Sequence, residues 1–209
     1  MPRPADPSVR TKLLAAAEQV FGSMGVERAH VEAISNTAGV SKGAFYSHFS
    51  SKDDAFVELV NSVTMRLREL IARPEFPAEP VGAEAFNALC LAFDVRIFEF
   101  IWENRRLMRI ILEGGRSHAF VHLLDAFAEY SRTLAKAHLD YGKREGYFRE
   151  DLDVDLAATF LSGGYDRLAR SVVRMNERPD LGALLASAQR TALFGIARTE
   201  GAASPGEPA

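Results

Sequence analysis

A compact group of hydrogen-bond donors lies in the segment VEAISNTAGVSKGAFYSHFSSK, residues 31–52. The donors are Lys42, Tyr46, His48 and Lys52. Ammonium, phenol and imidazole groups of this kind bind anionic oxygens such as those of phosphate. The small residues between them are Gly43, Ala44 and Ser47. Small side chains flanked by phosphate donors suit a helix that enters the major groove of duplex DNA.

Two short helices joined by a tight turn would position these donors. Apolar residues at helical spacing predict the first helix over about 31–38, and Gly39 turns the chain. Ser41 is placed to cap the second helix. Phe45 and Phe49 lie one helical turn apart and anchor that helix inward, which leaves the donors on its outer surface. The pattern predicts a helix-turn-helix.

The same segment resembles the DNA-binding domain of the TetR family of transcriptional regulators. The matching stretches are Ile34-Ser35-Asn36-Thr37-Ala38-Gly39-Val40-Ser41, Tyr46-Ser47-His48-Phe49 and Ser51-Lys52. The resemblance covers about residues 10–60. It implies a homodimer on DNA, phosphate contacts from Lys42, Tyr46, His48 and Lys52, and base-edge contacts from Gly43 and Ala44. Each donor taken singly also suits an ordinary solvated or capping position.

Three features depart from the family pattern or extend it. Ala29 and His30 stand where the family usually has a Thr or Ser that caps the second helix and contacts phosphate. Ser35 replaces a common Ala inside the packing. Arg3 and Arg10 could form an arm that reaches the minor groove, although a solvated tail suits them equally.

The rest of the chain predicts an all-α protein with about nine helices, because no segment shows sustained strand-like alternation. Pro74, Pro77 and Pro80 interrupt the chain after the fourth helix. We expect a DNA-binding domain over residues 1–52, a helical effector-binding and dimerisation domain over 53–199, and a loose tail over 200–209. The N-terminal segment before about residue 8 is expected to be loose as well.

Large apolar side chains are concentrated between residues 86 and 130, which suits a core that encloses an apolar small-molecule pocket. TetR-family proteins generally place their effector site in this part of the chain. The predicted lining residues are Phe93, Ile97, Trp102, Met108, Phe127 and Tyr165. A filled core without a cavity is the alternative.

The last two predicted helices carry apolar stripes with small residues, which suits a four-helix dimer interface. The predicted interface residues are Phe160, Gly164, Leu168, Leu184 and Ala188. The same stripes could instead pack within one subunit.

Other function classes find less support. His118 and His122 lie four residues apart with Asp125 near them, a spacing that can bind a metal, but two surface histidines are the simpler interpretation. No phosphate loop or Ser-His-Asp signature is present, so we expect no enzyme activity, metal or cofactor. A helical metal protein or enzyme, and a DNA-binding protein without effector, remain the alternatives.

Charge and cysteine usage agree with this interpretation. The net charge is −3, which argues against indiscriminate binding to nucleic acid. Residues 1–52 nevertheless hold six basic and four acidic groups, so positive charge gathers at the N-terminal end. A single cysteine, Cys90, excludes an intramolecular disulfide and fits a cytoplasmic protein.

Overall fold

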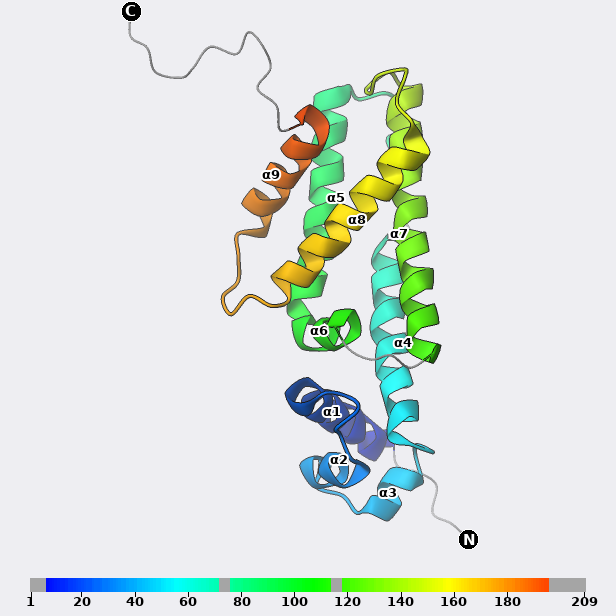
Figure 1. The fold of residues 1–209 in the computed structure, drawn as a ribbon, viewed down its shortest axis with the longest axis vertical. Helices are drawn as coiled ribbons and strands as arrows, with labels where there is room; N and C mark the ends of the chain where they lie inside the picture. Colours follow the sequence, from blue (N-terminus) through cyan, green and yellow to red (C-terminus); the bar gives the residue numbers. More distant parts are fainter. Residues whose placement is uncertain (1–6, 72–75, 114–117, 196–209) are drawn as a thin grey trace, which may run out of the picture.

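The computed structural model describes residues 7–71, 76–113 and 118–195, with backbone alone at residues 113, 118–124, 126 and 127. These residues form nine α-helices and no strand, which confirms the all-α prediction. Helices α1–α3 form one end of the molecule in Figure 1, and α5 with α7–α9 form the other. Helix α4 runs from one end toward the other.

The N-terminal end packs three helices around aromatic side chains. Helix α1 spans Pro7–Met24, α2 spans Val31–Ala38 and α3 spans Lys42–Tyr46. Their shared core buries Leu13, Ala17, Phe21, Ile34, Phe45 and Phe49. Gly39 ends α2 with φ of 69°, a left-handed conformation that residues with a Cβ atom disfavour.

Helix α4 spans Lys52–Ile71 and starts with two reciprocal side-chain caps. The Ser51 hydroxyl accepts from the Asp54 amide at 3.1 Å, and the Asp54 carboxylate accepts from the Ser50 amide at 3.0 Å. This arrangement fixes the direction in which α4 leaves the N-terminal end. The buried residues of α4 form one continuous stripe.

The larger end contains α5 (Ala83–Glu103), α6 (Arg105–Glu113), α7 (His118–Arg144), α8 (Val154–Val172) and α9 (Leu181–Phe194). Helix α8 packs mainly on α7, while α9 packs on α5. Asp153 caps α8 and Asp180 caps α9, each accepting from a backbone amide in the first turn. The predicted tail over 200–209 lies outside the described residues.

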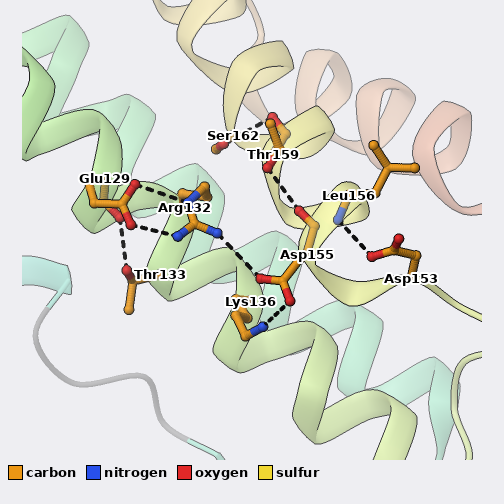
Figure 2. Close-up of polar contacts among 9 residues, drawn as sticks. All are labelled: Glu129, Arg132, Thr133, Lys136, Asp153, Asp155, Leu156, Thr159 and Ser162. Atoms are coloured by element: carbon orange, nitrogen blue, oxygen red, sulfur yellow. Dashed lines mark hydrogen bonds and ion pairs between the residues drawn. The ribbon is translucent and has the colours of Figure 1, made fainter.

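Ion pairs hold α7 against α8 (Figure 2). The Asp155 carboxylate, in the first turn of α8, accepts from Lys136 at 2.5 Å and from Arg132 at 3.5 Å. Arg132 is itself held by Glu129 on its own helix. The cations lower the pKa of Asp155, so the carboxylate stays ionised and the contact persists at neutral pH.

One hydrophobic cluster is continuous across both ends. It contains Phe21 of α1, Phe56 of α4, Met108 of α6 and Val172 of α8. Helix α4 therefore contributes to both predicted domains, and the division after residue 52 stays a prediction.

Candidate functional site

Helix α3 presents the predicted DNA-reading surface. The Ser41 hydroxyl accepts from the Ala44 amide at 3.1 Å, and the Phe45 and Phe49 rings pack with centroids 5.5 Å apart. These inward contacts orient the short helix, because Phe45 and Phe49 are both buried. The exposed residues on the outside are Lys42, Gly43, Tyr46 and Ser47. Ala44 and His48 are half-buried at its edge.

Two side chains of this surface, those of Ser47 and Tyr46, also make contacts within the protein. The Ser47 hydroxyl donates to the Ala44 carbonyl at 2.7 Å, so only its lone pairs face outward. The Tyr46 ring meets the Phe45 ring edge-on and is 52% exposed. Its hydroxyl can therefore reach a partner outside the protein.

Lys52 lies elsewhere than the prediction assumed. Its ammonium group donates to the carbonyls of Val26, Glu27 and Ala29 at 2.8–2.9 Å. Three donors are thereby matched to three acceptors in the turn before α2. Lys52 fixes that turn, and the structure gives no support to its role as a phosphate contact.

Arg10 is also placed differently from the expected DNA arm. Its guanidinium pairs with the Glu58 carboxylate and donates to the His48 carbonyl at 3.0 Å. It also lies over the Phe49 ring, 4.7 Å from the ring centroid. Arg10 therefore joins α1 to α4 and to the connection between α3 and α4, and does not form a free arm. Arg3 lies outside the described residues.

The departures at α2 have visible consequences. His30 occupies the N-cap position but makes no capping hydrogen bond with its side chain. Ser35 is 2% exposed, and its hydroxyl oxygen has no hydrogen-bond partner among the described residues. Both positions cost stability relative to the family pattern.

A cavity of about 560 Å³ lies within the larger end. Four of the six predicted lining residues do line it, namely Phe93, Ile97, Met108 and Tyr165. The Phe127 side chain lies outside the described residues. Whether an effector occupies this space stays a prediction.

Trp102 was predicted to line the cavity but does not. The α5 residues on the wall are Phe86, Asn87, Cys90, Phe93, Asp94, Ile97, Phe98 and Ile101. Trp102 follows Ile101 in the chain but is not among them. It is buried in the hydrophobic cluster instead, with the Arg105 guanidinium 4.7 Å from its ring centroid.

Asp94 and its neighbours are the polar wall residues that the sequence interpretation missed. The Tyr165 hydroxyl donates to Asp94 Oδ2 at 2.6 Å. Burial raises the pKa of Asp94 to about 6, against the opposing effect of the Tyr165 hydrogen bond. Burial also raises the pKa of the Cys90 thiol to about 12, so that group stays protonated and unreactive. The available signal was a carboxylate on an otherwise apolar stripe.

Helices α8 and α9 carry large apolar side chains that are exposed to solvent. Leu156, Phe160 and Phe194 are 67%, 76% and 72% exposed. A Cβ atom added to Gly164 would meet nothing within 4 Å, so this part of α8 is uncovered as well. The other predicted interface residues, Leu168, Leu184 and Ala188, are half-buried. Their role in a dimer stays a prediction.

The alternative metal site finds no support in the part of the chain that is described. The His118 and His122 side chains lie outside it, and Asp125 is exposed at the cavity wall. No group of three or more metal-ligating side chains occurs among the described residues. Among the same residues, no helix is long and apolar enough to cross a membrane.

Comparison with known proteins agrees with the helix-turn-helix geometry. Residues 13–59 match the family described as bacterial regulatory proteins, tetR family. The transcriptional repressor KstR2 of Rhodococcus jostii is 28% identical over 173 residues, covering 77% of this chain and 80% of its own.

Solved structures give the same fold. A TetR-like regulator from Rhodococcus sp. RHA1 superposes with a TM-score of 0.73 at 21% identity, covering 93% of this chain and 100% of its own. The regulator FadR of Bacillus subtilis, in complex with stearoyl-CoA, has a TM-score of 0.69 at 20% identity and covers 90% and 99%. The capped helix α3, called the reading helix below, belongs to a three-helix base formed by α1–α3. The described helices together have the fold of these solved structures. The chain is a TetR-like DNA-binding transcriptional regulator.

Proposed function

We propose that this protein is a repressor that binds a near-palindromic operator as a homodimer and leaves it when a mostly apolar small molecule fills the cavity. It acts in the cytoplasm, where bacterial DNA lies, and by binding alone, so we assign it no enzymatic activity. The name of the KstR2 relative supports repression.

The connection between cavity and reading helix carries the proposal. Helix α4 packs its Phe56 ring edge-on against Phe21 of α1, with centroids 5.4 Å apart, and lines the cavity with Leu67 and Ile71. An occupant that pushes the far end of α4 therefore acts on the helix that supports the reading helix.

Helix α6 forms a second connection, which the sequence interpretation missed. Met108 and Leu112 line the cavity. Ile110 lies against α1, with its Cδ1 3.9 Å from the position that a Cβ on Gly22 would take. Helices α4 and α6, which both contact α1, thus also contribute to the cavity wall.

The exposed faces of α8 and α9 support a two-fold dimer. Two-fold pairing places two reading helices about 34 Å apart, one turn of duplex DNA. An effector that changes this separation by moving α4 and α6 shifts the population away from the DNA-binding form. A few kcal/mol of differential affinity suffices for such a shift. By linkage, operator DNA must weaken effector binding by the same factor.

Selection of bound duplexes from a random pool tests the DNA part of the proposal. We expect a near-palindromic site, with Tyr46→Phe weakening binding to every sequence alike, because a phosphate contact carries no base preference. Ala44→Arg should change or abolish the preference by crowding the base edges. Absence of any palindromic site at low salt would contradict the proposal.

Ile97→Trp tests the effector part, since it fills the cavity from α5. The variant should keep operator binding and lose its response to compounds that release the wild type. Leu89→Trp is the matched control, because Leu89 is 44% exposed on the same helix and outside the cavity wall. If no compound releases the wild type in a broad screen, the protein binds DNA without an effector.

A further inference from the structure

One of the two carboxylate oxygens of Asp94 lacks a hydrogen-bond partner among the described residues. Asp94 lies in the middle of α5 on the cavity wall. Its Oδ2 accepts from the Tyr165 hydroxyl at 2.6 Å, while no described residue donates a hydrogen bond to its Oδ1. A carboxylate can accept several hydrogen bonds, so this one retains unused capacity toward the cavity.

The described wall offers Asp94 no cation. It holds three carboxylates, Asp94, Asp125 and Asp166, and one guanidinium, Arg170. Arg170 is committed to Asp166 at 2.8 Å and to the Leu112 carbonyl. The imidazole Nδ1 of His138 donates to the Leu134 carbonyl, and burial lowers the pKa of His138, so its ring stays neutral at pH 7.5.

A buried carboxylate without a cation is costly, and a ligand can remove that cost. Burial raises the pKa of Asp94 to about 6, so the group is mostly ionised at pH 7.5 but disfavoured there. An entering ammonium group would give the carboxylate a charge-assisted hydrogen bond in a medium of low polarity. An entering carboxylate would instead face the same charge.

The remainder of the cavity determines the remainder of the ligand. Leu67, Ile71, Phe93 and Ile97 present aliphatic and aromatic surface to the space of about 560 Å³. Apolar groups of an occupant are favoured there in proportion to the surface they bury.

We propose that the effector is an apolar molecule with a single protonated amine, which donates to the Asp94 carboxylate beside the Tyr165 hydroxyl. This inference rests on the proposed effector function and names the ligand class of the same cavity.

Three unbranched ten-carbon compounds test it at pH 7.5, at concentrations where each is fully dissolved as single molecules. Calorimetry would measure the binding of decylamine, decanol and decanoate to the full-length wild type and to Asp94→Asn. We expect the wild type to bind decylamine roughly tenfold to a hundredfold more tightly than decanol, the worth of one charge-assisted hydrogen bond. Decanoate should bind most weakly.

Asp94→Asn should lose the preference for the amine while keeping its affinity for decanol. The variant retains an oxygen that can accept from Tyr165, and circular dichroism checks its fold. Asp166→Asn is the matched control, because that carboxylate also lines the cavity but already has Arg170 as partner. It should keep the preference for the amine.

The outcomes separate this inference from the proposed function. If wild type binds decanol or decanoate as tightly as decylamine, or if Asp94→Asn keeps the preference, the amine inference is overturned and the effector cavity stands. If none of the three compounds binds the wild type, the proposed effector cavity fails and the inference fails with it.

Discussion

At the scale of residues, the two cations Lys52 and Arg10 show how a side chain can satisfy a motif and still serve the fold. Lys52 matches a phosphate-contact position of the family and Arg10 was one candidate for a DNA arm, yet each donates to carbonyls or a carboxylate within the three-helix base and α4. The spacing of a residue type predicts where a side chain starts. It does not predict which acceptors tertiary packing brings within reach.

Replacing Lys52 should therefore weaken the fold and leave DNA phosphate contacts intact. Lys52→Met removes hydrogen bonds from a charged donor, so we expect a loss of about 1–3 kcal/mol in the free energy of unfolding. The slope of log affinity against log salt should not change. Lys42→Met is the control, because Lys42 is exposed on α3, and it should reduce the slope by about one unit. A reduced slope for a folded Lys52→Met protein would restore Lys52 as a phosphate contact.

Ser35→Ala should stabilise the protein. The hydroxyl oxygen is buried without a described partner, so its removal relieves a desolvation cost of about 1 kcal/mol. Urea unfolding of both proteins measures the difference. A stability loss of similar size would show that the hydroxyl has a partner in solution, such as a water molecule.

Asp94→Asn should stabilise the unliganded protein in a pH-dependent manner. The folded-state pKa of about 6 lies above the ordinary value of 3.8, so the folded state binds the proton more tightly. Stability from this group is present at low pH and is lost as pH rises through about 6. The variant should exceed the wild type by on the order of 1–3 kcal/mol at pH 7.5 and by nothing below about pH 4. A pH-independent difference in thermal unfolding would contradict this origin.

At the scale of elements, helix boundaries followed from local signals. Gly39 ends a helix and Ser41 caps one where the sequence predicts it. These signals act within a few residues, so the sequence carries them openly. The Asp94–Tyr165 contact joins residues 71 positions apart, and no local pattern specifies it. The same limit explains why Trp102 was assigned to the cavity and why the contact of α6 with α1 was missed.

Gly142 illustrates a constraint between two elements. A Cβ on Gly142 of α7 would overlap the Phe148 ring, in the connection to α8. Gly142→Ala should therefore lower the free energy of unfolding by about 1–3 kcal/mol, through overpacking.

The double variant with Phe148→Leu separates this steric effect from helix propensity. Alanine favours a helix by about 1 kcal/mol over glycine once the clash is gone. The alanine should therefore be harmless or stabilising when Leu replaces Phe148. An equal loss in both backgrounds would place the clash elsewhere.

At the scale of the whole molecule, Gly164→Arg tests the proposed dimer. The subunit itself can accommodate the side chain, because nothing lies within 4 Å of the added Cβ. In a close helix–helix interface the same arginine should separate the subunits and lower operator affinity by at least about tenfold, since one half-site remains. Light scattering measures the mass. A folded Gly164→Arg dimer would move the interface away from this part of α8.

The separation between the reading helix at one end and the exposed faces of α8 and α9 at the other has a genetic consequence (Figure 1). A chain with a damaged α3 keeps the whole proposed pairing surface, so under the proposed dimer it would still combine with normal chains. In a cell with equal amounts of both, random pairing leaves about one quarter of the dimers with two working reading helices. Loss-of-function alleles in α3 should therefore be dominant over the wild-type allele, whereas alleles that destroy the α8–α9 surface should be recessive.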